Sequence, residues 1–296
     1  MPGRGLAPDG RQVPIALPDL GSDPGELAGA AARLWSGPRP KRIPLLPPLV
    51  RPEDLPAPGQ DPEPGVPIGI DELELAPVYL DLEGADPHFL ILGDSESGKT
   101  TLLRSWMAGL QARRDASRAM FLVVDYRRTL LDACRPEQLR AYGGAAPAAS
   151  AAVRELAQGI VERLPPANLS PDAIAARSWW TGPDLYVVVD DYDLVASPAG
   201  NPLLPLVELL AQGRDLGLHL VLARRVGGMA RSGFEPVLAR LRELHSPGLI
   251  LSGDPTEGPL LGLHRAAPQP PGRGLLVRRR RPPVLVQTVN ATRTAG

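Results

Sequence analysis

Apolar residues in the second half of the chain fall into short runs separated by longer amphipathic stretches. Four such runs occupy residues 89–92, 120–124, 186–189 and 219–223, and a shorter one lies at 249–251. These runs have the length of strands that are buried on both faces, and they are too short for buried helices. Strands that alternate with helical stretches predict a parallel sheet covered by helices on both faces.

The stretches between the strands carry apolar residues at helical spacing. The first helix is expected to bury Leu102, Leu103, Trp106, Met107 and Leu110. A second stripe runs over residues 153–164 and ends before two consecutive prolines, which cannot continue a helix. A helical stretch is expected over residues 203–212, stopping at Gly213, and a late helix over residues 237–244. The core is therefore expected to be α/β.

The first third of the chain has a different pattern. Residues 27–35 can form one face of a short helix. Eleven prolines then fall between Pro38 and Pro67, which excludes regular helices and central strands and favours an extended belt on the core surface. A flexible linker is the alternative, but the apolar residues inside the belt argue against it. Short strands are expected at residues 66–70 and 78–82.

A five-residue motif occurs near both ends of the chain. Residues 2–6 and 271–275 both read PGRGL, and each copy precedes a second apolar stretch, at 13–17 and at 284–289. Each copy predicts a strand, a polar turn and a second strand. Chance identity in a chain rich in proline and glycine is one explanation, and an internal duplication is the better one.

This repeat suggests a domain organisation. Residues 1–24 are expected to be the closing hairpin of a preceding domain that is similar to the one in this chain. Residues 25–85 form a proline-rich extension with short strands, and residues 86–290 form the core domain. The chain is then one piece of a longer tandem array.

Composition and charge narrow the functional classes. With 32 basic and 33 acidic residues the net charge is −1, so no global field attracts DNA or an acidic membrane surface. Aromatic residues make up 4%, and no row of stacking rings for single-stranded nucleic acid is present. The single cysteine, Cys134, excludes an internal disulfide and fits a reducing compartment. No apolar run reaches 18 residues, so the segment is expected to be soluble.

The segment after the strand at residues 89–92 carries the clearest chemistry, because it reads GDSESGKT and matches G-x-x-x-x-G-K-[ST]. Two glycines let backbone N–H groups converge on phosphate oxygens, the lysine can reach the outer phosphates, and the threonine hydroxyl can ligate Mg²⁺. A strand before the motif and a helix after it support a phosphate-binding loop. The expected nucleotide-binding residues are Gly93, Asp94, Ser95, Glu96, Ser97, Gly98, Lys99, Thr100 and Thr101.

Two carboxylates, Asp190 and Asp191, follow the strand at residues 186–189. Ligands bind at the carboxyl ends of strands in open parallel sheets, so Asp190 is expected to orient Mg²⁺ beside Thr100. In hydrolysing P-loop enzymes the next residue is usually a glutamate that positions the attacking water. Asp191 is one methylene shorter, which should cost about a hundredfold in rate. The alternative is that the two aspartates only cap a turn.

Other charged residues bear on the same site. Asp94 and Glu96 place negative charge inside the loop and should weaken phosphate binding unless they face water. Arg224 follows a strand at the place where a sensor of the γ-phosphate is expected. It could contact phosphate, pair with the two aspartates, or lie with Arg225 in a solvated basic turn. Asp125, after another strand, belongs to the site or caps a helix, and we favour the cap.

The remaining polar features are interpreted as structural. Residues 278–281 are four arginines in the turn of the predicted last hairpin, where contact with nucleic acid is the less favoured alternative. His219 and His264 lack a second ligand at metal-binding spacing, so neither is expected to bind a metal.

Four segments together resemble the FtsK/SpoIIIE-type ATPases: GDSESGKT, VVVDDYDLV, GRDLGLHLVLARR and PPGRGLLV. More narrowly, they resemble the last (third) ATPase domain of EccC, the multi-ATPase motor of type VII (ESX) secretion. The resemblance covers residues 66–290 and implies a RecA/FtsK-like P-loop NTPase fold with ATP and Mg²⁺ as cofactors. DNA-pumping relatives keep a glutamate at the position of Asp191 and a Thr-Gln-Arg-Pro turn at residues 223–226, where this chain departs from them.

The resemblance also implies a function. A weakly or non-hydrolysing ATPase module is expected, with Asp191 and Arg224 as degenerate catalytic residues, which recognises the C-terminal signal peptide of a secreted WXG100-type helical dimer. Its other partners are neighbouring ATPase domains of the same chain, with no nucleic acid. It is expected in the cytoplasmic part of a membrane-anchored complex and to meet the membrane only through that complex. The alternatives are an FtsK-like DNA translocase motor domain, which needs strong hydrolysis, and a structural domain with an empty loop.

Overall fold

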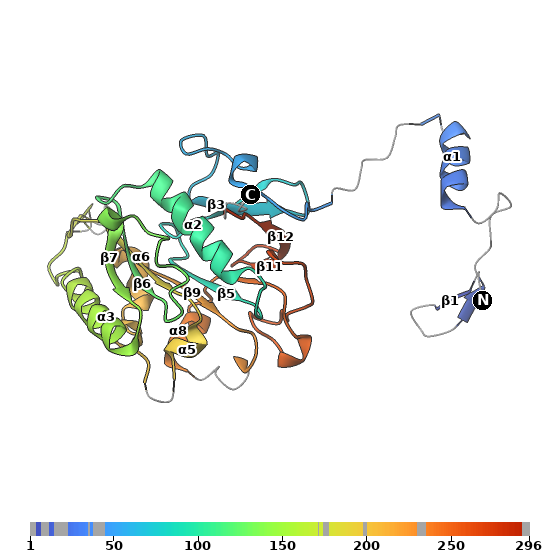
Figure 1. The fold of residues 1–296 in the computed structure, drawn as a ribbon. Coiled ribbons are helices and arrows are strands. Elements are labelled where there is room, and N and C mark those ends of the chain that lie inside the picture. The colour runs from blue at the N-terminus through green and yellow to red at the C-terminus, as the bar shows by residue number, and fades with distance from the viewer. Residues whose placement is uncertain are drawn as a thin grey trace. The chain divides into compact units, whose positions relative to one another are not determined.

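The computed structural model describes residues 4–6, 12–14, 23–34, 36–37, 45–170, 172–173, 178–197, 200–229 and 235–291. It divides into two compact units, Met1–Ile43 and Pro44–Gly296. The first unit contains strands β1 (Arg4–Leu6) and β2 (Gln12–Pro14) and helix α1 (Pro24–Leu34), as Figure 1 shows. The helix expected over residues 27–35 is confirmed, and it starts earlier because proline is tolerated in a first helical turn.

Both copies of the repeated motif form antiparallel hairpins. In the first copy Gly5 pairs with Val13 across β1 and β2. In the second copy Gly274 pairs with Val286 across β11 (Arg273–Val277) and β12 (Val284–Thr288). The second copy therefore has the expected strand, turn and strand. In the first copy both strands are present, and the expected turn and residues 15–17 lie outside the described residues. The duplication, and the boundaries at 24/25 and 85/86, stay predictions.

The second unit is built on one ten-stranded sheet with the order β4-β3-β12-β11-β10-β5-β9-β8-β6-β7. The strands not yet located are β3 (Val66–Asp71), β4 (Pro77–Leu80), β5 (His88–Leu92), β6 (Ala119–Val124), β7 (Leu139–Gly143), β8 (Asp184–Val189), β9 (Leu218–Arg224) and β10 (Gly248–Ile250). From β10 to β7 all neighbours are parallel, which confirms the predicted α/β fold. Strands β3 and β4, from the proline-rich extension, and β11 and β12, from the last hairpin, continue the sheet beyond β10 with antiparallel neighbours.

Helices cover both faces of this sheet, as predicted. Helix α2 (Lys99–Arg113) runs across one face in Figure 1 and buries Trp106 against Phe89 and its neighbours. The opposite face carries helices α3 (Ala146–Val161), α5 (Tyr192–Val195), α6 (Gly213–Leu216) and α8 (Pro236–Glu243). Successive residues of β5 alternate between the two apolar clusters, so the strand that leads into the loop is fixed from both sides.

The continuous helix expected over residues 203–212 is wrong. The structure has two short 3₁₀ helices there, Leu204–Leu206 and Leu210–Gln212. Pro205 supplies no N–H, so it favours a short turn over a long helix. Gly213 begins α6 instead of ending a helix. A Cβ at this glycine would lie 2.7 Å from the His88 ring, so the close approach to β5 requires glycine.

Two further features differ in detail from the sequence pattern. Strand β7 was not predicted, because the sequence LRAYG of this edge strand contains no apolar run. Pro67 lies inside β3 at a shift of register, which is where a sheet tolerates a missing N–H. Residues 45–65 contain only a 3₁₀ turn at Pro52–Asp54 and a bridge from Val50 to Val289, in agreement with the predicted belt. No described helix is long and apolar enough to cross a bilayer.

Candidate nucleotide-binding site

The predicted phosphate loop connects β5 to α2 at the carboxyl edge of the parallel strands. Gly98 caps α2 with a φ of 106°, which glycine adopts without strain. A Cβ at Gly93 would lie 2.5 Å from the Ser97 hydroxyl oxygen, so both glycines are required by geometry. Ser97 is 3% exposed, and among the described residues its hydroxyl has no hydrogen-bond partner. The loop therefore offers a buried polar atom and the N-terminus of a 15-residue helix to an anion.

Lys99 is folded back over this loop. Its ammonium group donates a hydrogen bond of 2.7 Å to the Asp94 carbonyl oxygen, and the residue is only 6% exposed. Burial lowers the pKa of Lys99, while the charges of Asp191 and Asp190 act in the opposite direction. A cation held among carboxylates at the start of a helix is placed to neutralise phosphate oxygens.

The Thr100 hydroxyl and Asp190 are joined, as the sequence predicts for a metal-binding pair. Thr100 Oγ1 donates to Asp190 Oδ2 over 2.7 Å, and Thr129 Oγ1 donates to the same oxygen over 3.1 Å. Asp190 is 1% exposed, and burial raises its pKa. A desolvated carboxylate beside a hydroxyl is the oxygen set that Mg²⁺ prefers, so these residues fit that ion. The sequence did not identify Thr129, although it follows the neighbouring strand β6.

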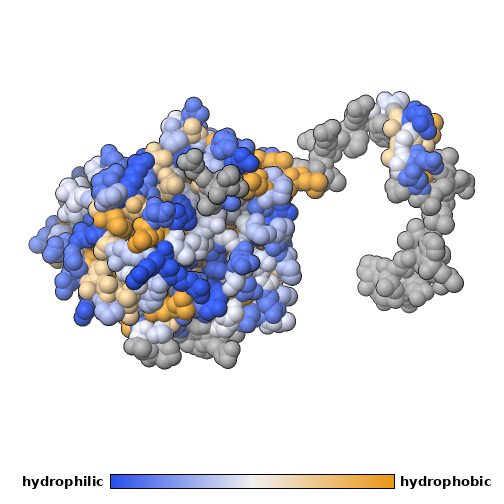
Figure 2. Space-filling model, viewed as in Figure 1, coloured by the Kyte–Doolittle hydropathy of each residue, from blue (hydrophilic) through white to orange (hydrophobic). Residues whose placement is uncertain are grey.

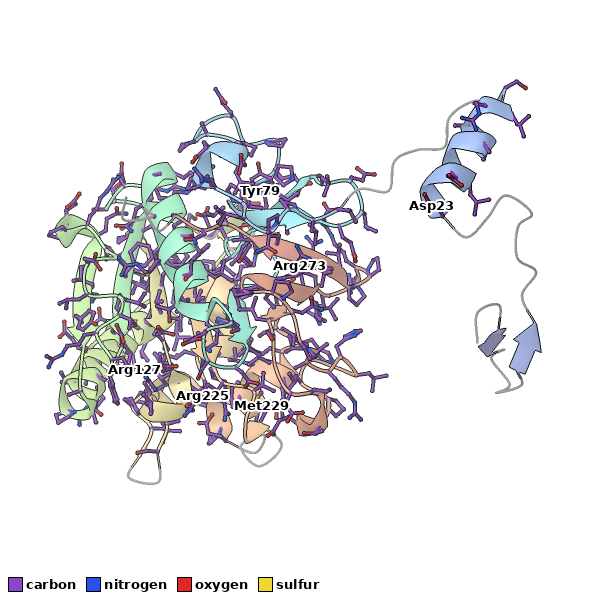
Figure 3. The ribbon with its side chains drawn as sticks, turned by 45° about the vertical axis from the view of Figure 1, so that its right-hand side comes forward. Asp23, Tyr79, Arg127, Arg225, Met229 and Arg273 are labelled. Carbon is purple, nitrogen blue, oxygen red and sulfur yellow. The ribbon has the colours of Figure 1, made fainter. Side chains whose placement is uncertain are left out.

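Asp191 has a different environment from Asp190. Its backbone is left-handed, with a φ of 46°, and its carboxylate forms an ion pair of 2.5 Å with the Arg127 guanidinium. Asp193, two residues further on, pairs with Arg225 through a hydrogen bond of 2.7 Å. Arg127 and Arg225 lie at the same end of the second unit in Figure 3. Both acidic groups are therefore partly neutralised by arginine.

Arg224 is the last residue of β9. It is 5% exposed, so the solvated turn considered for it is wrong. Burial lowers its pKa, and the opposing charges are those of Asp193, Tyr192 and Glu235. Its carbonyl oxygen accepts a hydrogen bond of 3.2 Å from the Gly93 N–H, which ties β9 to the loop.

The two acidic side chains of the loop are arranged to limit repulsion. Asp94 Oδ2 accepts a hydrogen bond of 3.1 Å from the backbone N–H of Asp254. Glu96 is exposed to solvent and has a φ of 61°. A solvated carboxylate is screened from neighbouring charges, so Glu96 should oppose an anionic ligand only weakly.

Asp125 and the histidines have structural contacts. Asp125 accepts hydrogen bonds from the backbone N–H groups of Arg127 and Leu130, so it caps the loop that presents Arg127 and Thr129. His219 stacks on Tyr186 with ring centroids 4.5 Å apart. The described residues include no group of three histidine, cysteine or acidic side chains arranged to hold a metal ion.

Comparison with known proteins shows which family this chain resembles. The model of the FtsK/SpoIIIE family matches residues 62–159. The ESX secretion system protein EccC of Thermomonospora curvata is 43% identical over 97% of this chain, and EccC4 of the Mycobacterium tuberculosis ESX-4 system is 48% identical over 93%. The chain covers 22% of each of these proteins, so it spans about a fifth of their length.

Solved structures give the same result. The cytoplasmic domain of the type VII secretion ATPase EccC from T. curvata superposes with a TM-score of 0.81 at 42% identity, over 99% of this chain and 35% of that one. ATPases 2 and 3 of the same EccC, in complex with a signal sequence peptide, give a TM-score of 0.82 at 42% identity, over 99% of this chain and 54% of that one. A structure named only as an ATPase is 31% identical, with a TM-score of 0.71, over 77% of this chain and 88% of that one.

Proposed function

Since the chain belongs to the FtsK/SpoIIIE-type P-loop ATPases, among which it resembles EccC of ESX secretion systems, we propose that it binds ATP and Mg²⁺ and hydrolyses ATP slowly. In this proposal it is a module of a type VII secretion ATPase and recognises the C-terminal signal peptide of secreted WXG100-type substrates. It acts beside neighbouring ATPase domains, on the cytoplasmic side of a membrane-anchored complex.

One contrast within the site carries the proposal. The groups that would bind nucleotide and metal are in contact, with Thr100 bonded to Asp190 at 2.7 Å. The carboxylate in the position that activates water, Asp191, is instead paired with Arg127. A carboxylate oxygen that is held by a guanidinium is not free to accept a hydrogen bond from an attacking water and orient it. Nucleotide binding is thus favoured over turnover.

Recognition of a secreted substrate rests on the relatives. The solved ATPases 2 and 3 of T. curvata EccC carry a signal sequence peptide, and this chain is 42% identical to them. The net charge of −1 gives no basic surface field for DNA, which supports a peptide partner over the translocase alternative.

Thermal unfolding tests the nucleotide half of the proposal. ATP with Mg²⁺ should raise the melting temperature of the protein, because a ligand that binds only the folded state stabilises it. Lys99→Ala should abolish the shift. Lys41→Ala removes the only other lysine of the chain and should leave the shift intact. Equal shifts in the two variants, or robust steady-state hydrolysis by the wild type, would contradict the proposal.

Fluorescence anisotropy tests the recognition half. A labelled peptide with the C-terminal signal of a WXG100-type substrate should bind, and a peptide of the same composition in scrambled order should not. Absence of binding up to high micromolar peptide would refute recognition. Salt-dependent binding of duplex DNA together with strong hydrolysis would instead favour the translocase function.

A further inference from the structure

A cavity of about 340 Å³ lies at the edge of the sheet opposite to the phosphate loop. It is lined by Phe89, near the start of β5, and by Pro247, which precedes β10, and these two parallel strands both run toward the loop edge. Tyr79 also lines the cavity, and in Figure 3 it lies at the other end of the second unit from Arg127 and Arg225. The cavity is therefore separate from the candidate nucleotide-binding site.

The floor of the cavity is apolar. Ile68, Phe89 and Leu276 line it, and all three belong to the buried apolar cluster on the α2 face of the sheet. The volume is near the lower end of the range of about 300–1,000 Å³ that is usual for ligand sites. A concave apolar floor of this size suits one or two side chains of a peptide.

The turn between β11 and β12 adds three positive charges to this cavity. The turn contains four consecutive arginines at 278–281, of which Arg278, Arg279 and Arg281 line the cavity and Arg280 does not. Arg280 has a left-handed backbone with a φ of 57°, and two prolines follow Arg281 before β12 begins. Because proline fixes its own φ, the turn has a defined path, and its arginines are not equivalent.

These arginines lack partners within the described part of the chain, where none of the four forms an ion pair or a side-chain hydrogen bond. Arg113, by contrast, is paired with Asp61 at 2.7 Å. The Nε–H group of Arg278 is buried, and no acceptor among the described residues reaches it. Burial lowers the pKa of Arg278, and the charge of Arg281 lowers it further. A buried donor next to a second guanidinium favours the binding of an anionic oxygen.

Carboxylates in the same lining decide which kind of anion fits. Glu63, Asp81 and Asp86 line the cavity together with the three arginines. Nucleic acids and anionic membranes bind through many negative charges, which these carboxylates would repel. Figure 2 shows hydrophobic residues of the second unit in small groups between hydrophilic ones, unlike the broad apolar face of a membrane-bound surface. A peptide with one carboxylate beside an apolar side chain matches both the arginines and the apolar floor.

We propose that this cavity binds a peptide segment of a partner protein in which a carboxylate lies next to an apolar side chain. The carboxylate accepts hydrogen bonds from Arg278 and Arg281, and the apolar side chain packs over Ile68 and Leu276. The inference goes beyond the proposed function, because this site needs no nucleotide and lies at the opposite edge of the sheet. The arginine turn is then part of a binding site rather than only the end of a hairpin.

Fluorescence anisotropy with two labelled peptides tests this assignment. One peptide carries a leucine followed by a glutamate in an alanine background, and the other has glutamine in place of the glutamate. The wild type should bind the glutamate peptide about tenfold more tightly, as expected for a hydrogen bond to a charged group. Arg278→Gln should remove this preference. Arg280→Gln makes the same change outside the cavity and should keep the affinity within about twofold of wild type.

A second variant and a second readout complete the test. Arg281→Gln should also remove the preference, so the assignment stays testable if Arg278→Gln does not fold. The NMR signal of the Arg278 Nε–H group should shift when the glutamate peptide is added, and that of Arg280 should not. Equal affinity of the wild type for both peptides, equal losses in Arg278→Gln and Arg280→Gln, or tighter binding of duplex DNA or anionic vesicles than of the glutamate peptide would overturn the assignment. The effect of ATP on the melting temperature should be the same in all three variants, which keeps this test independent of nucleotide binding.

Discussion

The carboxyl edge of the parallel sheet has two acidic positions in sequence with opposite environments. Asp190 is 1% exposed and is contacted by the hydroxyls of Thr100 and Thr129. The side chain of Asp191 is 18% exposed and is paired with Arg127. The first arrangement concentrates negative charge for a cation, and the second cancels it. In the proposed function, metal binding and water activation are therefore assigned to adjacent residues with different environments.

Electrostatics explains why the two environments favour different chemistry. Burial raises the pKa of Asp190, so its ionised form is destabilised until a cation approaches. A bound Mg²⁺ would offset this cost directly. Arg127, with a side chain that is 53% exposed, already offsets the charge of Asp191. An attacking water would compete with that ion pair for the same carboxylate oxygen.

The largest expected effect comes from removing the charge of Asp190. Asp190→Asn keeps the side-chain shape but should weaken Mg²⁺·ATP binding about 100-fold, which corresponds to about 2.7 kcal/mol. Isothermal titration calorimetry with and without Mg²⁺ measures the effect, and binding of metal-free ADP should change little.

Asp193→Asn is the matched control, because Asp193 is paired with an arginine, as Asp191 is. It makes the same chemical change two residues away, where the carboxylate is bonded to Arg225 rather than to Thr100. Nucleotide affinity should then stay within about threefold of wild type. If both variants lost affinity equally, the difference between the two environments would have no functional meaning.

A glutamate at position 191 that is free of its arginine partner should raise the rate of ATP hydrolysis. Asp191→Glu lengthens the acid, and Arg127→Gln removes its ion pair, so the double variant frees a carboxylate to orient water. We expect the steady-state ATPase rate to rise about tenfold over wild type, which is less than the roughly 10²–10⁴-fold that a well-positioned base contributes. Either single variant should give less. A double variant that stays at the wild-type rate would show that the Arg127 contact does not limit hydrolysis.

The sequence predicts those parts of the candidate site that depend on residues close together in the chain. The loop from Gly93 to Thr101 follows from glycine, lysine and threonine at fixed spacing, and Asp190 follows from its place after a buried strand. Arg127 and Thr129 were missed, because the turn capped by Asp125 brings them to the site and no periodic pattern marks that turn. Contacts between distant segments carry no local signal.

The fold shows the same division between local and distant determinants. Buried strands such as β8 were predicted because their apolar runs are continuous. Strand β7 was missed because it pairs on one side only and lies at the sheet edge. The helix expected over residues 203–212 is broken at Pro205, and Gly213 lies against His88, a contact between residues far apart in sequence that no local pattern shows.

The smallest expected effect comes from Thr129, whose hydroxyl donates a hydrogen bond to Asp190. Thr129→Val removes the hydroxyl but keeps the branched shape, so Asp190 loses one hydrogen bond of 3.1 Å and keeps the bond from Thr100. This bond is longer than the one from Thr100, so we assign it the net value of an ordinary hydrogen bond, about 1 kcal/mol, and the Mg²⁺ concentration for half-maximal ATP binding should change about three- to fivefold. Thr129→Ser retains the hydroxyl and should behave as wild type. A Ser variant as impaired as the Val variant would assign the effect to packing, and an unchanged Val variant would exclude Thr129 from the metal side altogether.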